Sequence, residues 1–307
     1  MDQNTLTRKQ FHILTFLDSC QGKVNQRTIS EATGISLATV SRTVSALAEH
    51  GYLREYKLTE AAYEALEPYR VKRAVFFAAG FGHRLVPITL NTPRSLIRVK
   101  GVRLIDTMLD AVLAAGIEEI YIVRGYLGEQ FDQLLHKYPN IRFVENPMYN
   151  ESFNISSAMC VRHLLQNAYV LEADLLLRNP SLIQKYQYRS NYVGVPVSMT
   201  HDWCFQAKNG VITSVSIGGK DCYHMFGISY WSSQDGACLY EDIRQVYEQP
   251  GGKERYWDLV PLQYCKDRYR VEARACSFAD VAEIDTIADL EKLDPAYISG
   301  GTTWRTK

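Results

Sequence analysis

Apolar positions in residues 1–69 recur at helical spacing and are separated by short polar breaks. Capping residues precede three such segments and stop signals follow two of them: Thr7 with Gln10, Asn25 with Gly34, and Ser36 with Gly51. Helix, glycine turn, helix is typical of a helix-turn-helix unit. We therefore expect a small, mainly α domain over residues 1–69, with Glu67–Arg70 as its linker.

From residue 70 onwards, short apolar runs alternate with amphipathic stretches. The runs that have the length of buried strands are residues 74–79, 117–123, 141–144 and 169–177. Residues 104–115 form an amphipathic helical pattern between the first two runs, and this alternation predicts an α/β, Rossmann-like, doubly wound sheet. Residues 190–280 carry further β-type segments, Tyr192–Val197, Val211–Ile217 and Met225–Trp231, which predict a mixed β extension. The second domain is expected over residues 70–307.

A glycine loop follows the first predicted strand. Gly80 and Gly82 let backbone N–H groups approach an anion, and Arg84 adds a planar donor fork suited to phosphate oxygens. Leu85 occupies the place of the third glycine of a dinucleotide fingerprint, and no lysine follows as a Walker loop requires. The loop is thus expected to hold a polyphosphate at the carboxyl end of the strand.

The whole segment from Ala74 to Arg94 is more specific than its glycines. It resembles the strand and A-A-G-x-G-S/T-R-L-x-P-x-T-x-x-x-P-K motif of sugar-phosphate and choline-phosphate nucleotidyltransferases, with His83 and Arg94 replacing a hydroxyl residue and a lysine. Asn146, Tyr149, Asn154 and Ser157 resemble the choline-phosphate branch. The resemblance implies that these residues bind the nucleotide: Ala79, Gly80, Phe81, Gly82, His83, Arg84, Tyr126, Asn146, Asn154 and Ser157. It implies catalytic roles for Arg84, Arg94 and Asp174.

Two aspartates are the expected metal ligands. Asp174 ends an apolar run, where a carboxylate is costly unless it is paired or binds a cation, and oxygen ligands suit Mg²⁺. Asp285 lies in Glu283–Thr286, which resembles the family's E-I-D-S/T segment, whose aspartate completes the metal site. An N-cap role for Asp285 is the alternative.

Aromatic residues are dense in the extension. Rings beside a carboxylate attract a quaternary ammonium group, and the choline-phosphate cytidylyltransferases resemble this chain there. The expected acceptor pocket contains Trp203, Tyr230, Trp231, Tyr256, Trp257 and Asp258. The resemblance implies transfer of CMP from CTP to phosphocholine, giving CDP-choline and pyrophosphate. A sugar 1-phosphate or 2-aminoethylphosphonate is an alternative acceptor.

The first domain resembles MarR-type winged-helix regulators from Ile29 to Leu53, and Leu58–Leu66 resembles the helix after the wing. The DNA-facing candidates are Ser36, Thr39, Ser41, Arg42 and Ser45. Equal numbers of basic and acidic residues in this domain weaken phosphate attraction, so a dimerisation or docking module is the alternative. A third hypothesis is a transcription regulator that senses CTP or CDP-choline through a degenerate enzyme domain.

Composition places the chain among ordinary globular proteins, with 46% hydrophobic and 22% charged residues and zero net charge. The 7 cysteines are scattered without a C-x-x-C pair. The start Met1–Asn4 is polar, so we expect no secretory leader. No apolar run has transmembrane length. A reducing cytoplasm and no membrane partner are expected. The sequence leaves open whether the chain forms a homodimer.

Overall fold

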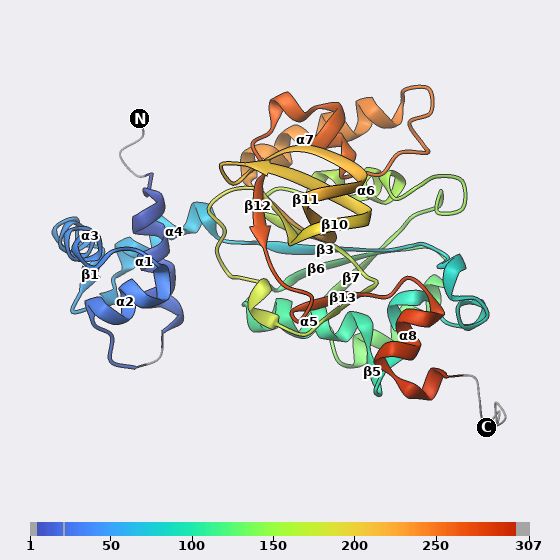
Figure 1. The fold of residues 1–307 in the computed structure, drawn as a ribbon, viewed down its shortest axis with the longest axis horizontal. Coiled ribbons are helices and arrows are strands. Elements are labelled where there is room, and N and C mark those ends of the chain that lie inside the picture. The colour runs from blue at the N-terminus through green and yellow to red at the C-terminus, as the bar shows by residue number, and fades with distance from the viewer. Residues whose placement is uncertain (1–4, 21, 299–307) are drawn as a thin grey trace. The chain divides into compact units, whose positions relative to one another are not determined.

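The computed structural model describes residues 5–20 and 22–298, and Figure 1 shows its elements. Met1–Asn4, on which the expectation of no secretory leader rests, lies outside the described residues. Two compact units divide the chain: Met1–Arg70 with Tyr186–Tyr188, and Val71–Lys185 with Arg189–Lys307. We call them the small unit and the large unit.

The small unit contains the expected helix-turn-helix. Its elements are α1 (Arg8–Ser19), α2 (Gln26–Thr33), α3 (Leu37–Glu49), β1 (Leu53–Arg54), β2 (Lys57–Leu58) and α4 (Glu60–Leu66). Thr7 and Gln10 form the predicted capping box, and Asn25 caps α2. Gly34 ends α2 at φ 68°, in the left-handed region that glycine adopts without strain. Ser36 precedes α3 without a side-chain cap bond.

The core of the small unit joins its helices to a segment distant in sequence. Ile13, Leu14 and Val40 are fully buried there. Tyr188 stacks on Tyr69 with ring centroids 5.4 Å apart and donates to the carbonyl of Leu6. The unit therefore depends on residues from the middle of the chain as well as on its first seventy.

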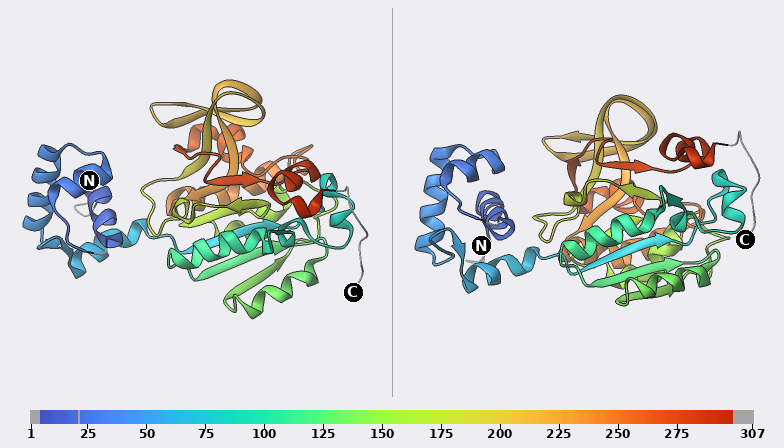
Figure 2. Two further views of the ribbon diagram at one scale, coloured as in Figure 1. Left: turned by 60° about the horizontal axis from the view of Figure 1, so that its bottom comes forward. Right: turned by 90° about the horizontal axis from the view of Figure 1, so that it is seen from below.

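A seven-stranded sheet forms the middle of the large unit, as Figures 1 and 2 show. In spatial order the strands are β10 (Asn191–Lys208), β12 (Glu272–Ala275), β11 (Val211–Trp231), β8 (Ala168–Glu172), β3 (Arg73–Ala78), β6 (Glu119–Arg124) and β7 (Ile141–Glu145). β8, β3, β6 and β7 run parallel, whereas β11 is antiparallel to β8. The predicted α/β class with a mixed extension is confirmed.

The two long strands replace three shorter predicted ones. β10 and β11 pair antiparallel over much of their length, and Figure 2 shows their far part (yellow to gold) extending away from the sheet. The segment after β6, Gly128–His136, is a 3₁₀ helix. Two small sheets accompany the main one: β4 (Arg98–Val99) with β5 (Val102–Arg103), and β9 (Leu175–Leu177) with β13 (Val281–Glu283).

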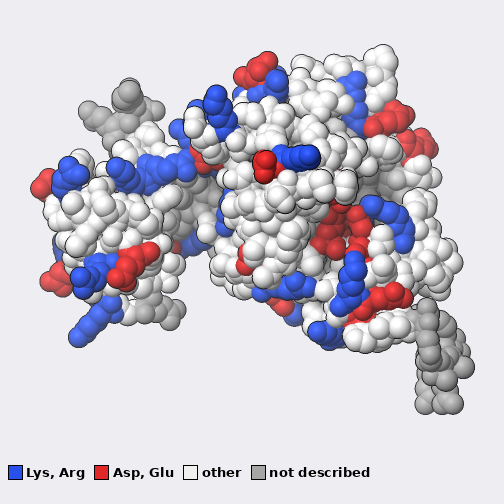
Figure 3. All heavy atoms as spheres, in the orientation of Figure 1, with Lys and Arg blue, Asp and Glu red and all other residues white. Residues whose placement is uncertain are grey.

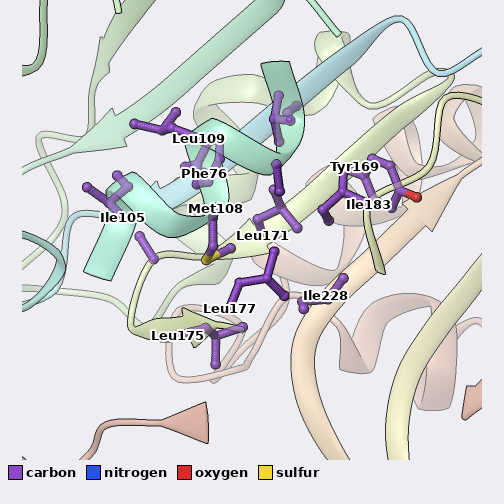
Figure 4. Packing of buried hydrophobic residues seen from close by; sticks show 14 of the residues in the cluster. Phe76, Ile105, Met108, Leu109, Tyr169, Leu171, Leu175, Leu177, Ile183 and Ile228 are labelled. Atoms are coloured by element: carbon purple, nitrogen blue, oxygen red, sulfur yellow. The ribbon is translucent and has the colours of Figure 1, made fainter. Parts of the chain in front are cut away.

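Helices cover the sheet and bury its apolar side chains. They are α5 (Leu104–Ala114), α6 (Ile155–Val161) and α7 (Ser233–Tyr247). The last helix, α8 (Ile287–Leu293), instead packs in a separate apolar cluster with Leu85 and Ile284. Figure 4 shows α5 placing Ile105, Met108 and Leu109 against residues of the strands. Phe76 and Met108 are fully buried, and burial of one such side chain stabilises the fold by about 1.5–3 kcal/mol. Among the described residues, no helix has the length and apolar character needed to cross a bilayer.

Candidate active site

The strand after β8 brings three carboxylates together. The chain turns at Ala173, whose N–H donates to the carbonyl of Phe77, and Asp174 follows at the end of the sheet. β9 then leaves the main sheet and pairs with β13, which places Leu175 opposite Glu283. The N–H of Ile284 donates to the carbonyl of Asp174 at 3.2 Å. Backbone pairing thus joins Asp174 to a segment more than a hundred positions later.

The carboxylates of Asp174, Glu283 and Asp285 each offer an oxygen within 4.8 Å of the others. Asp174 is buried, and its Oδ1 has no hydrogen-bond partner. A buried unpaired carboxylate oxygen is costly unless a cation binds it, and three hard oxygen donors fit Mg²⁺. Figure 3 shows acidic side chains gathered in a hollow of the large unit, with basic side chains beside them.

Two arginines contact these carboxylates. Arg94 directs one guanidinium nitrogen to Asp174 Oδ2 and another to Asp285 Oδ1, the latter at 2.9 Å. Arg84 reaches the same Asp285 oxygen at 2.9 Å, although its side chain is 67% exposed. The structure therefore brings together Arg84, Arg94, Asp174 and Asp285, which the sequence had separated by up to two hundred positions.

Burial and crowding shift the protonation of this group. Burial, together with the charges of Asp174 and Asp285, raises the pKa of Glu283 well above its usual range. Burial also raises the pKa of Asp285, although Arg94 opposes the shift. Burial disfavours charged Arg94, but its acidic neighbours raise its pKa further. Three carboxyl groups share two arginines here, and a bound cation would favour the ionised form of Glu283.

The glycine loop closes on Arg94. Gly82 has φ 71°, and its carbonyl accepts from the Thr89 hydroxyl at 3.0 Å. A Cβ at Gly82 would lie 3.3 Å from Arg94 Cβ, so the absence of a side chain lets the loop pack on the arginine stem. Phe81 contacts the rings of His83 and Tyr126, and the N–H of Tyr126 donates to the carbonyl of Ala79. Gly80 is exposed with open space beside it.

A second group of ligand atoms shares Glu283 with the first. Asp202, His224 and Glu283 also present atoms within 4.8 Å of one another. His224 Nδ1 lies 3.1 Å from the Thr200 hydroxyl, and burial lowers the pKa of His224 below its usual value. A neutral imidazole carries a proton on one ring nitrogen and can accept a hydrogen bond at the other.

Glu172 and Asp258 add two half-buried acids nearby. Asn154 donates to Glu172 Oε1 at 2.9 Å and accepts from the N–H of Trp257 at 2.9 Å. Burial and the charges of Asp174 and Asp258 raise the pKa of Glu172 to about 8. Burial raises the pKa of Asp258 to about 6, against a hydrogen bond from Tyr192 that lowers it.

The six residues expected in the acceptor pocket differ in exposure and in position. Trp203 and Tyr256 contact each other edge to face at 5.6 Å, and Phe153 joins Tyr256 at 5.1 Å. Trp257 is buried, packing on Phe77 and Trp231. The sequence could not separate exposed from buried rings, because both lie in alternating β or loop segments.

Tyr230 and Trp231 are not brought to this region. They pair with Tyr169 and Ala168 at the start of β8, the end opposite Asp174. The Tyr230 hydroxyl donates to Asn167, and the Trp231 indole donates to Ser229. Both side chains are buried and belong to apolar clusters on either side of the sheet, so they stabilise the fold.

The polar segment before α6 is internally bonded. Asn146 is buried and donates from Nδ2 to Ser156 at 2.9 Å and Ser157 at 3.1 Å. A Cβ at Gly125 would lie 2.6 Å from the Tyr149 ring. These contacts order the segment that carries Asn154, while a nucleotide contact by Asn146, Asn154 or Ser157 stays a prediction.

On α3, the DNA candidates differ in exposure. Ser36, Arg42 and Ser45 are exposed, whereas Thr39 and Ser41 are half-buried. The Ser36 hydroxyl donates to Thr39, and Arg42 Nε donates to the carbonyl of Ala38 at 3.4 Å.

Sequence reasoning missed several members of the site. Glu172 and Glu283 stand two residues before Asp174 and Asp285, and i, i+2 spacing in extended chain places side chains on one face. That spacing could have revealed both. No local pattern marked His224, because only the pairing of β10 with β11 and the β9–β13 sheet bring it near Glu283.

A glycine loop, two arginines and a carboxylate group at the carboxyl end of a doubly wound sheet define a class, the metal-dependent transferases of nucleotide phosphates. The comparisons agree. The nucleotidyl transferase family matches residues 73–212, and the IclR helix-turn-helix domain matches residues 7–56. The first domain thus matches the IclR type, where the sequence had suggested the MarR type.

Three relatives sharpen this class. A 2-aminoethylphosphonate cytidylyltransferase of Lancefieldella rimae is 36% identical over 233 residues, covering 73% of this chain and 93% of the relative. A choline-phosphate cytidylyltransferase of Haemophilus influenzae is 30% identical, covering 72% and 97%. The structure of CTP:phosphocholine cytidylyltransferase from Streptococcus pneumoniae has TM-score 0.69 and 30% identity, covering 74% and 99%. The chain belongs to the nucleotidyltransferase family, within its group of cytidylyltransferases, and carries an IclR-type helix-turn-helix domain.

Proposed function

We propose that this chain transfers CMP from CTP to a small acceptor that carries a phosphonate or phosphate at one end and an amine at the other. The first candidate is 2-aminoethylphosphonate, on which the Lancefieldella rimae relative is named to act. The large unit supplies the catalytic site, and Mg²⁺ is the cofactor that its oxygen ligands suit.

The group of Asp202, His224 and Glu283 is the observation that favours an acceptor with a primary amine. An –NH₃⁺ group has three donors, and this group offers a neutral imidazole and two carboxyl groups whose ligand atoms lie within 4.8 Å of one another; a bound ammonium would favour the ionised form of Glu283. A trimethylammonium group has no N–H to donate. Since Glu283 also belongs to the Asp174 group, an amine held here lies next to the metal-facing carboxylates, as a short acceptor requires.

Phosphocholine is the second candidate because one observation favours it. Phe153, Trp203 and Tyr256 form a connected aromatic group, in which Phe153 and Tyr256 are exposed. Each ring facing a quaternary ammonium contributes about 0.5–2 kcal/mol. Tyr230, Trp231 and Trp257, which were also expected in the acceptor pocket, are buried. Fewer rings can therefore face a quaternary ammonium group, which makes phosphocholine the weaker candidate.

The proposed reaction is an in-line displacement. An ionised oxygen of the acceptor forms a bond to the α-phosphorus of CTP, the bond to the bridging β-phosphate oxygen breaks, and pyrophosphate leaves. Mg²⁺ on Asp174 and Asp285 would neutralise charge on the phosphates. Arg84 and the N–H groups of residues 79–83 bind the β- and γ-phosphates, and Arg94 binds near the α-phosphate. No general base is needed, because the acceptor oxygen is already ionised near pH 7.

The test is pyrophosphate release from CTP with 2-aminoethylphosphonate, phosphocholine and glucose 1-phosphate as separate acceptors. We expect the aminophosphonate to have the largest kcat/KM. Asp202→Asn with His224→Ala should reduce that value at least tenfold and leave phosphocholine turnover within about twofold. Trp203→Ala should do the reverse.

Trp257→Ala is the matched control for the aromatic group. Its ring is buried, so we expect loss of about 3–5 kcal/mol of stability and no change in acceptor preference. Equal turnover of all three acceptors by the unaltered chain, or turnover of the sugar phosphate alone, contradicts the proposal.

For the small unit, we propose DNA binding through α3, with Arg42 as its exposed charge. The IclR-type match supports this role. A gel-shift assay with DNA from the chain's own promoter, with and without CTP, tests it. Arg42→Ala should weaken binding, whereas Arg73→Ala in the large unit should not. Absence of any shift at low salt contradicts DNA binding.

A further inference from the structure

Arg94 makes two contacts that a divalent cation would make. One guanidinium carries both an Asp174 contact and the 2.9 Å contact to Asp285, so its planar fork bridges the two carboxylates. Arg84 supplies a second guanidinium to the same Asp285 oxygen. The two arginines together carry two positive charges, which is the charge of one Mg²⁺.

We infer that Arg94 acts as a placeholder for the metal ion: it holds Asp174 and Asp285 together in the nucleotide-free enzyme and must move onto the phosphates before the ion binds. The inference rests on the metal-dependent transfer proposed above and not on the identity of the acceptor. It makes metal binding depend on the nucleotide.

The geometry around the stem of Arg94 allows this movement. The Cβ and Cδ atoms of Arg94 lie 3.3 and 3.6 Å from the position of a Cβ on Gly82, so the stem packs on the glycine loop. That loop is where phosphates would bind. The guanidinium therefore contacts the carboxylates while its stem packs on the glycine loop, and rotation about the side-chain bonds is the movement that the inference requires.

The unpaired oxygen of Asp174 explains why a metal ion could take the place of Arg94. Asp174 Oδ1 is buried without a partner even with Arg94 in place. Glu283 lies in the same group, with an oxygen within 4.8 Å of those of Asp174 and Asp285. An ion can contact three carboxylates where the arginine contacts two, so binding of the ion satisfies more of the group once phosphates attract Arg94 away.

An arginine suits this role better than a lysine. Its two terminal nitrogens reach two carboxylates at once, whereas an ammonium is a single point charge. The unusual Arg94, at a position where the family motif has lysine, then strengthens the coupling between nucleotide and metal.

The test is Mn²⁺ binding to the full chain without nucleotide, followed by electron paramagnetic resonance of the free ion. We expect weak binding by the unaltered chain, at least tenfold tighter binding by Arg94→Gln, and an intermediate value for Arg94→Lys. Arg73→Gln breaks a single arginine–carboxylate pair at the start of β3, the end away from the glycine loop, and should bind Mn²⁺ like the unaltered chain. Arg94→Gln combined with Asp285→Asn should lose the gain.

Thermal melting gives a second measurement. Mn²⁺ alone should raise the melting temperature of Arg94→Gln more than that of the unaltered chain, because the variant binds the ion more tightly without nucleotide. Equal Mn²⁺ affinity of Arg94→Gln and the unaltered chain overturns the inference, as does a gain that survives Asp285→Asn. Neither readout involves an acceptor, so failure of the proposed substrate would leave this result intact.

Discussion

Two buried arginine–carboxylate groups in the large unit differ in how completely they are satisfied. Arg103 Nε donates to both oxygens of Asp106 at 3.0 Å, and its Nη1 donates to Gln133 at 3.0 Å. Arg94 instead serves two aspartates that compete for it, and Asp174 keeps an unpaired oxygen.

The difference separates a structural pair from a ligand site. A buried charge pair with every partner present stabilises one geometry, whereas an incomplete one is stabilised further by a ligand. The Arg103 group lies at the start of α5, and the Arg94 group lies where the sheet ends and the glycine loop turns. A carboxylate oxygen without a partner therefore distinguishes the ligand site from the structural pair more clearly than burial does.

Asp106→Asn should give the largest effect on stability. It leaves the Arg103 guanidinium buried without its carboxylate, which costs about 3–5 kcal/mol. Urea unfolding measures this loss. Activity per folded molecule should stay within about twofold, because Asp106 is far from the glycine loop in sequence and contacts. A variant as stable as the unaltered chain would contradict the structural assignment of this pair.

Asp174→Asn should affect turnover and not stability. It removes a metal ligand worth several kcal/mol to charge neutralisation, so pyrophosphate release should fall at least about a hundredfold. The free energy of unfolding should stay level or rise, because the variant relieves crowding among Asp174, Glu283 and Asp285. Turnover comparable to that of the unaltered chain would remove Asp174 from the catalytic group.

Glu172→Gln should change the pH dependence of stability. The pKa of Glu172 is about 8 in the folded chain and near its ordinary 4.5 when unfolded, so the folded state holds a proton that the unfolded state releases between these values. Stability is therefore full below about pH 4.5 and falls by up to about 1.4 kcal/mol per pH unit towards pH 8.

Glutamine keeps the acceptor for Asn154 and cannot ionise, so Glu172→Gln should flatten this slope in urea unfolding series from pH 5 to pH 8. Glu119→Gln, which removes a half-exposed carboxylate paired with Arg73, is the control and should leave the slope in place. The same slope in both variants would show that Glu172 ionises normally.

Arg84→Lys should give the smallest effect. The Arg84 side chain is 67% exposed, so its pair with Asp285 contributes at most about 1 kcal/mol to stability. Loss of the planar fork should raise the KM for CTP roughly fivefold, which corresponds to about 1 kcal/mol. Steady-state kinetics and melting curves measure the two quantities. A large drop in melting temperature would assign Arg84 to the fold instead of the ligand.

The sequence predicted the order of elements well because local patterns decide them. The capping box at Thr7, the glycine at position 34 and the apolar run of β3 each specify a local structure. The glycine loop and Asp174 were identifiable because each ends an apolar run that has the length of a buried strand. The burial of the Trp231 and Trp257 rings could not be predicted, because local sequence does not tell which face of a segment packs against another layer.

By itself, the sequence determined the helix-turn-helix, the α/β class and the segments that carry the arginines and aspartates. Tertiary structure alone decided which of them meet. The pairing of β9 with β13 adds Glu283 to Asp174 and Asp285, and the pairing of β10 with β11 brings His224 towards the same edge. The reason is physical: capping and periodicity act over a few residues, whereas the energy of a charged group depends on neighbours that only long-range strand pairing brings together.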